Sequence, residues 1–296
     1  MNTNPRNVRK QGHKSLIAAV RSVFLLVVLL QVSQAQWYVN NSNYNEAPFK
    51  VGEQLQFKVK WGFVRLGSVF MYQERVSQQD PQLYRLVARA RSAAGLPFVN
   101  VDLINRATLS SHNPRNCDFR FIDNSSARSG ADFSYDSCTS IETMTGIDDG
   151  KDTTTTKIYC EEQCFDALGF MMFVRALSGS GYRLTVPLIM QNCLKKTQII
   201  FHKEIEKITI GLSDEPVLAH RFETTGDWSD SHSAGMNGKM TGWTSADSAA
   251  VPLLVEMKIA VGSVRVELES FTREGWVPPV ASRSTDTIAI VRRGEK

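Results

Sequence analysis

The chain has 296 residues, of which 42% are hydrophobic and 22% are charged. This much apolar material can form one large core or two modest ones, so disorder throughout the chain is excluded. With 19 Gly and 10 Pro and no fixed repeat of either, the composition also excludes collagen-like and linker-dominated proteins. The sequence therefore predicts a globular protein.

The positive charge of the chain, formally +4, is concentrated at the N-terminus. Residues 1–35 hold five of the 34 basic residues and no acid, which leaves 29 basic residues against 30 acids in the rest of the chain. A neutral domain lacks the positive surface that phosphate binding requires. We therefore expect no nucleic-acid partner.

Residues 1–35 have the three-part pattern of a secretory signal. Basic residues up to Lys14 precede an apolar run at 22–30, and the small residues Ser33 and Ala35 follow it. The apolar run is much shorter than the roughly 20 residues that a membrane span needs, although a retained anchor is the alternative. We expect cleavage, a bacterial periplasmic or secreted protein, and no transmembrane segment in the mature chain.

Short strands are expected after a polar lead-in at 36–50. From Leu55 to Phe63, apolar residues alternate with polar residues or glycine, which is typical of a strand with one buried face. Gly262 separates the last two predicted strands, as a hairpin or a bend. Beyond the strand at 55–63, strands are predicted at 67–76, 83–92, 181–189, 197–202, 207–212, 217–223, 253–261 and 264–268.

One helix is predicted, at about 161–177. Acids lie in its first turn and Arg175 in its last, and the Ser-Gly-Ser-Gly run at 178–181 ends it. Its residues are apolar on nearly every side, which is typical of a buried helix. Because a buried guanidinium needs acceptors, we expect Arg175 to be only partly exposed and to contact a carboxylate or several carbonyls.

The pattern predicts a mainly β fold, in which an antiparallel curved sheet, half-barrel or barrel-like, packs on this central helix. We expect a single β-rich domain at 51–275. Residues 276–296 would form a C-terminal tail or a last strand. The sequence leaves open whether the sheet closes into a barrel.

Five cysteines follow the signal, and export permits disulfides between them. Cys160 and Cys164 are four residues apart at the predicted helix start, close enough for a bridge with slight distortion. They form the first disulfide candidate, and Cys117 and Cys138 form the second.

The second candidate depends on the pairing of two predicted strands. A simple hairpin places Cys117 opposite Cys138, but pairing Phe119 with Tyr135 requires a register one residue different. A bulge, for instance at Gly130, would reconcile the two arrangements.

No established catalytic or metal-binding motif occurs. The chain has no Gly-x-Ser-x-Gly elbow, no Ser-x-x-Lys and no glycine-rich phosphate loop. The Cys-x-x-x-Cys pair has no matching second pair, and His202 and His220 are isolated on predicted strands. We therefore assign no catalytic residue, no metal site and no cofactor.

In their order along the chain, several motifs resemble the bacterial domain-of-unknown-function family 3108, whose members are exported proteins. The resemblance covers about residues 49–275 and implies export and a β-rich fold. It implies no established activity, so it transfers no catalytic residue. The motifs are the segment 49–61, Gly67, the segment 84–92, Phe165 to Gly169 with Arg175, the segment 243–252 and the segment 259–268.

Three functions are compatible with these features. A non-catalytic envelope protein could enclose a lipid or other hydrophobic ligand, with Phe63, Met171, Met172 and Val255 as lining residues. The second function is a structural or protein-interaction module of the envelope with a filled core. The third is a hydrolase that acts on an envelope polymer through a pair of carboxylates.

Some of these residues also have structural interpretations. Met171 and Met172 are at helical spacing, where methionine is ordinary core material. Asp166, Arg175 and Asp247 would form a polar cluster at the mouth of the curved sheet, or each would have a structural role.

The signal pattern makes a prediction about the exported product. We expect its first residue to be Gln36, because signal peptidase accepts small residues such as Ser33 and Ala35 before the cleaved bond. N-terminal sequencing or intact mass of the exported protein checks this. A product that still contains residues 22–30 would contradict it and indicate an anchored protein.

Overall fold

The computed structural model describes residues 44–96, 100–112, 115–124, 129–136, 140–145, 154–159, 164–190, 193–226, 239–259 and 262–282. The predicted signal at 1–35 and two cysteines of the disulfide candidates, Cys138 and Cys160, lie outside these residues. No helix in the described part is long and apolar enough to cross a membrane.

Fourteen strands of the described residues form one sheet in which neighbours are antiparallel. Helix α2 (Ala167–Ala176) separates the first eight strands from the last six. The strands are β1 (Gln54–Trp61), β2 (Val64–Arg75), β3 (Leu83–Ser92), β4 (Asp102–Ser110), β5 (Arg115–Asp123), β6 (Ser129–Asp136), β7 (Ser140–Thr145), β8 (Thr154–Tyr159), β9 (Arg183–Met190), β10 (Cys193–Ile208), β11 (Val217–Gly226), β12 (Met240–Ser245), β13 (Pro252–Lys258) and β14 (Ser263–Thr272).

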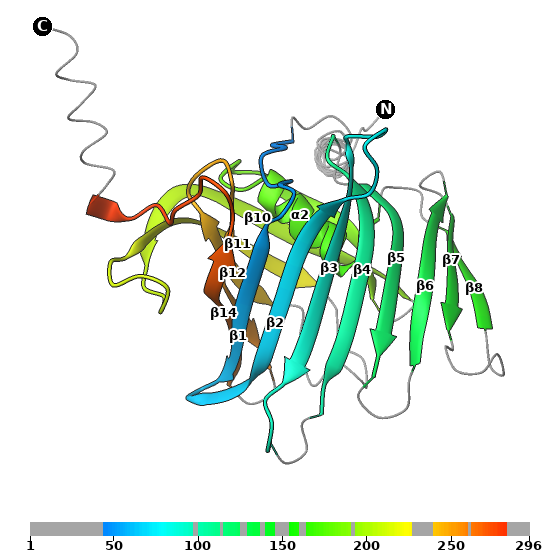
Figure 1. Ribbon diagram of the computed structural model, residues 1–296, viewed down its shortest axis with the longest axis horizontal. Coiled ribbons are helices and arrows are strands. Elements are labelled where there is room, and N and C mark those ends of the chain that lie inside the picture. The colour runs from blue at the N-terminus through cyan, green and yellow to red at the C-terminus, as the bar shows by residue number, and fades with distance from the viewer. Residues whose placement is uncertain are drawn as a thin grey trace, which may run out of the picture. The chain divides into compact units, whose positions relative to one another are not determined.

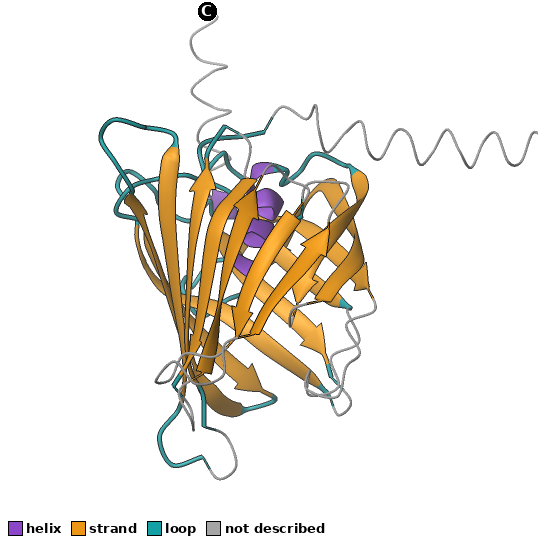
Figure 2. Cartoon of the chain, turned by 90° about the vertical axis from the view of Figure 1, so that its right-hand side faces the viewer, coloured by secondary structure: helices purple, strands orange, loops and turns teal. Residues whose placement is uncertain are grey.

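The strands lie in the sheet in nearly the order of the chain. From one edge to the other they run from β8 to β1 and then from β14 to β9, so the first and last strands pair in the middle. The sheet is open between β8 and β9, the two strands that α2 connects. It curls around α2 (Figures 1 and 2), which packs against β4 on one side of the opening and against β9 on the other. The prediction of a mainly β, antiparallel curved sheet packed on one central helix is confirmed.

Two apolar clusters surround the helix and the paired first and last strands. The first joins residues of β3, β4 and β5 to Leu168 and Met172 of α2 and Ile189 of β9. The second packs Leu55 and Phe57 of β1 against β11, β13, β14 and the segment after β14. Leu55 and Phe57 are buried as the alternation predicts, but Trp61 is exposed and Phe63 lies in the turn after the strand. The predicted buried face therefore covers only the first part of β1.

The helix is shorter than predicted and begins later. Asp166 caps it, because its Oδ1 accepts hydrogen bonds of 2.8 Å from the backbone N–H groups of Leu168 and Gly169. Phe165, predicted to be helical, instead forms a parallel bridge with Leu188 of β9. The predicted start at 161 is wrong, because the helix begins at Ala167 and Phe165 pairs with the sheet.

Several strand boundaries also differ from the predictions. β10 is one strand where two were expected, and its register with β11 shifts between Phe201 and Ile205, so a local irregularity absorbs the polar interruption. β4, β7, β8 and β12 were not predicted. Trp243, at the start of the motif segment 243–252, lies in β12.

The pairing of β5 with β6 follows neither expected register. Phe119 pairs with Phe133 and Phe121 pairs with Ala131. Both expected registers assumed a simple turn centred near residue 127, whereas the observed pairs are centred at residue 126.

Residues on both sides of the expected domain pack against it. Pro48 and Phe49 of the lead-in are buried, and Asn45 Nδ2 donates to the Ser248 carbonyl at 2.6 Å. After β14, Trp276 and Val280 are buried, and Val280 forms a bridge with Val217. The described parts of the lead-in and of the C-terminal segment therefore belong to the folded unit.

Gly67 shows why one motif position requires glycine. A Cβ atom there would lie 2.1 Å from the carbonyl oxygen of Arg91 on the neighbouring strand β3. No side chain fits at that distance unless the two backbones separate, so glycine allows β2 and β3 to pair closely at this point.

Candidate functional site

The most strongly polar site in the described interior centres on Glu53, directly before β1. Its backbone N–H donates to the Lys50 carbonyl at 3.1 Å, and its carbonyl accepts from the Gln73 N–H at 3.0 Å. Gly52, which precedes it, has φ +80°, a conformation that glycine adopts without strain. This turn places the Glu53 side chain in the interior, where the residue is 1% exposed.

Arg175, in the last turn of α2, reaches Glu53 from the helix side. Its Nη1 and Nη2 atoms donate to the two carboxylate oxygens at 2.7 and 2.8 Å. This is the paired geometry in which a guanidinium binds a carboxylate most strongly. Arg175 also donates to the carbonyls of Ala250, at 3.2 Å, and Ala249, at 3.1 Å. At 1% exposure, it is buried and paired as the sequence predicts.

A second arginine and an amide complete the environment of Glu53. Arg273, which follows β14, donates to Glu53 Oε1 and to the Ala47 carbonyl. The Gln73 amide donates to Glu53 Oε2 and to the Pro48 carbonyl. We call Glu53, Gln73, Arg175 and Arg273 the buried charged cluster.

The cluster uses the full accepting capacity of Glu53. Its two oxygens accept four hydrogen bonds from the cluster, two from Arg175 and one each from Arg273 and Gln73. An ionised carboxylate offers about four lone-pair sites. Glu53 therefore has no lone pair left to accept a proton from a substrate or to bind a metal ion.

The electrostatic balance favours the ionised form of Glu53. Burial by itself raises the pKa of this carboxyl, but the charges and hydrogen bonds of Arg175 and then Arg273 outweigh burial and hold the pKa below its ordinary value. The side chains of Arg175 and Arg273 carry two positive charges against the single negative charge of Glu53. The carbonyl oxygens of Ala47, Ala249 and Ala250 accept their other hydrogen bonds and help to offset the excess positive charge.

Asp247 holds the turn that presents two of these carbonyls. Its Oδ1 accepts from the N–H groups of Ala249 and Ala250 at 3.0 and 3.2 Å, and its Oδ2 accepts from Trp276 Nε1 at 2.8 Å. Ala250 has φ +44°, a left-handed conformation that is costly for alanine. The contacts of Asp247 and Arg175 with this turn maintain it.

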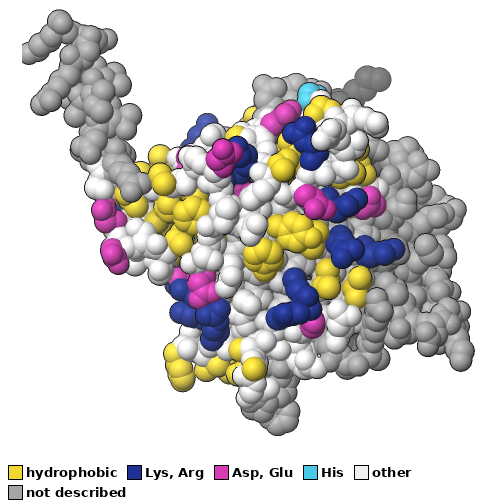
Figure 3. Space-filling model, viewed as in Figure 1, with side chains coloured by type: hydrophobic (Ala, Val, Ile, Leu, Met, Phe, Trp, Pro, Cys, Tyr) yellow, Lys and Arg dark blue, Asp and Glu magenta, His cyan; other side chains and the backbone are white. Residues whose placement is uncertain are grey.

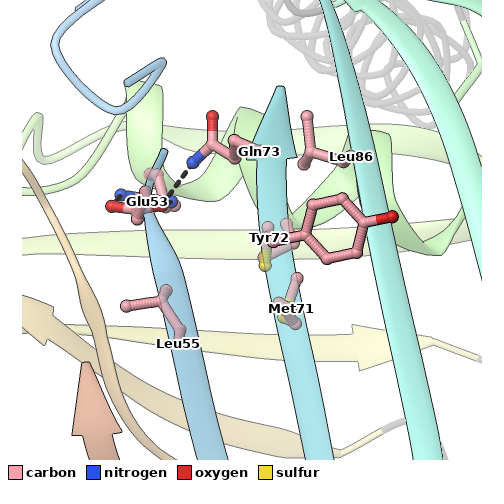
Figure 4. Close-up of a pocket in the computed structure, with 8 residues that line it drawn as sticks. Glu53, Leu55, Met71, Tyr72, Gln73 and Leu86 are labelled. Atoms are coloured by element: carbon pink, nitrogen blue, oxygen red, sulfur yellow. Dashed lines mark hydrogen bonds and ion pairs between the residues drawn. The ribbon is translucent and has the colours of Figure 1, made fainter. Parts of the chain in front are cut away.

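A small pocket lies beside the cluster (Figure 4). Its volume is about 10 Å³, close to the smallest space that holds one water molecule. Glu53 and Gln73 lie together at one side of it, and Leu55 and Met71 lie toward the other (Figure 4). The lining residues are Glu53, Leu55, Met71, Tyr72, Gln73, Leu86, Met171 and Arg175.

The structure brings two of the three predicted polar residues near each other. Asp247 supports the turn whose carbonyls bind Arg175, although these two side chains form no ion pair with each other. Asp166 caps the opposite end of α2, nine residues and roughly 13 Å away along the helix.

The four residues predicted to line a ligand cavity do not share a pocket in the described part of the chain. Met171 lines the small pocket, and Met172 is fully buried. Val255 lies half-buried in β13, and Phe63, at 98% exposure, lies in the turn between β1 and β2. Ligand binding by these residues stays a prediction.

The disulfide candidates also stay predictions, because each has one cysteine outside the described residues. Cys117 is exposed and Cys164 is buried. Cys164 precedes the helix, so the helical spacing assumed for it and Cys160 does not apply. No group of three His, Cys, Asp or Glu side chains in the described ranges could hold a metal ion.

The sequence predicts the buried pairing of Arg175, but it does not indicate Glu53, Gln73 or Arg273 as its neighbours. In the sequence, Arg175 is 122 residues from Glu53, and Arg273 is 220 residues from it. The available signal was the acid of Val51-Gly52-Glu53, directly before the most regular alternating strand. When the pairing of the strands is unknown, Glu53 cannot be told apart from a surface acid at the start of a strand.

The cluster predicts unequal effects of removing its members. We expect Glu53→Gln to lower the free energy of unfolding by about 3–5 kcal/mol, because two buried guanidiniums lose their carboxylate. Arg175→Met should cost about half as much, since Glu53 keeps Arg273 and Gln73 and methionine fills the vacated volume. Urea unfolding followed by circular dichroism measures both effects.

Arg65→Met is the matched control, because Arg65 pairs with Glu269 at a more exposed position. Its expected cost is below about 1 kcal/mol. A larger loss for Arg175→Met than for Glu53→Gln would contradict this account of the cluster.

Comparison with known proteins identifies the family of the chain and supports its fold. Residues 56–269 match the family described as "Protein of unknown function (DUF3108)". None of the curated proteins is significantly similar in sequence.

The solved structures that are similar to the chain include the following two. The β-barrel-like protein of domain of unknown function DUF1849 from Brucella abortus is 10% identical, with a TM-score of 0.52 over 75% of this chain and 98% of that chain. It supports the β-barrel-like fold alone. A putative exported protein with a YmcC-like fold from Bacteroides fragilis is 9% identical, with a TM-score of 0.28 over 76% and 98% of the two chains. The family match covers most of the chain, which therefore belongs to the DUF3108 family of proteins of unknown function.

Proposed function

We propose that the protein is an exported cell-envelope protein that acts as a non-catalytic structural or interaction module. The observation that carries this proposal is the saturation of Glu53. The most strongly charged group of the described interior is committed to holding α2, the start of β1 and the end of β14 together. A group with this role stabilises the fold and has no free capacity for acid–base chemistry.

The packing around α2 supports the same proposal. The helix buries Leu168, Met172 and Phe173 against the sheet, and the pocket between it and β1–β3 has room for about one water. Close packing between α2 and β1–β3 is what we expect of a module that acts through its surface. A carrier that encloses a lipid needs a cavity of several hundred Å³ or more.

Export is supported by the pattern of residues 1–35, in which a basic stretch, a short apolar run and small residues follow each other. The neutral charge of the remaining chain also favours a partner other than nucleic acid.

Native mass spectrometry tests this proposal against an enclosed ligand. The protein is purified without detergent from cells that export it, and its mass is measured under native and denaturing conditions. We expect the same mass in both, because the pocket between α2 and β1–β3 has room for about one water molecule. A stoichiometric adduct of lipid size that is lost on denaturation would overturn the proposal and favour a carrier of hydrophobic ligands.

A further inference from the structure

The turn between β1 and β2 exposes two aromatic side chains. Phe63 is 98% exposed and Trp61 is 43% exposed, with Gly62 between them at φ +57°. We call these three residues the aromatic tip. Single exposed apolar residues are common, but adjacent exposed aromatic rings form an apolar patch of the kind that contacts a partner or a membrane.

Basic side chains lie directly behind the aromatic tip. In the register of the sheet, Lys60 of β1 lies opposite Arg65 of β2 on one side and Arg265 of β14 on the other. Arg65 is paired with Glu269, and Arg265 is paired with Glu256 and Glu267. In the ranges that the structure describes, no carboxylate lies within ion-pair distance of Lys60.

The charge of this end of the sheet is positive. The described residues of 58–65 and 256–269 include five basic and three acidic side chains, an excess of two positive charges. In the space-filling view, hydrophobic side chains lie at the lower left, where Figure 1 places the β1–β2 turn, and basic side chains lie just above them (Figure 3).

We propose that the aromatic tip inserts into the surface of a lipid bilayer that contains anionic lipids. Aromatic side chains bury their rings among the headgroups and upper acyl chains, and nearby Lys and Arg side chains are attracted to anionic headgroups. The aromatic tip supplies the first interaction, and the net positive charge behind it supplies the second.

The geometry of the turn favours a lipid surface over a protein partner. Phe63 projects from the end of a hairpin, and a Cβ atom on Gly62 would meet no other atom within 4 Å. A projecting side chain of this kind needs a preformed cavity in a protein, whereas lipid adapts to it. Strand β1 pairs along its length with both β2 and β14, so the fold holds the aromatic tip in place.

This inference concerns a different site from the buried charged cluster and does not require an empty concave side. Native mass spectrometry reports on an enclosed ligand, whereas binding to vesicles reports on the aromatic tip. The two proposals can therefore fail separately.

Co-sedimentation of the purified full chain with unilamellar vesicles of phosphatidylethanolamine and phosphatidylglycerol tests the inference. We expect Phe63→Ser to weaken partitioning by at least about tenfold, because the most exposed ring is lost. Lys60→Gln should weaken it less, and about 1 M salt should weaken binding of the wild-type protein by screening the charges.

Ile205→Ser is the matched control, because Ile205 is 56% exposed but lies on β10. We expect it to bind vesicles as the wild type does. Thermal melting of each variant verifies that it is folded. The inference is overturned if the wild type does not sediment with vesicles, if Phe63→Ser binds equally well, or if Ile205→Ser loses as much binding. Absence of vesicle binding would redirect the search to a protein partner.

Discussion

The hydrogen bonds to the Glu53 carboxylate hold together segments from both ends of the folded chain. They join the start of β1, the end of β2, the last turn of α2 and the residue that follows β14. β1 and β14 come from opposite ends of the folded chain and pair in the middle of the sheet. One buried carboxylate therefore stabilises both the pairing of the first strand with the last strand and the position of the helix.

The placement of the helix depends on the same interaction. Arg175 is held at its guanidinium by Glu53 and by the carbonyls of the turn that Asp247 organises. The apolar side chains of α2 provide most of the buried surface, but apolar contacts are not directional. The ion pair is directional, because the Arg175 guanidinium donates to both Glu53 oxygens only when the helix has a particular position and orientation. The rigid sheet that results also holds the aromatic tip at the end of the first hairpin.

The parts of this fold that could be predicted from the sequence are those whose signal is local. The alternation in β1, β3 and β13 is visible within each strand, and Arg175 stands out on an otherwise apolar helix. The register of β5 with β6 and the unbroken course of β10 depend on the partner strands. Glu53 could not be assigned because its partners are brought to it only by the complete topology.

A double-mutant cycle on Glu53 and Arg175 measures how far each side chain depends on the other. The free energy of unfolding is measured for the wild type, Glu53→Gln, Arg175→Met and the double variant. If the two side chains act as one unit in the buried charged cluster, we expect a coupling energy of about 2 kcal/mol or more. Effects that add within about 0.5 kcal/mol would contradict it, because the pair would then not be what holds the helix in the sheet.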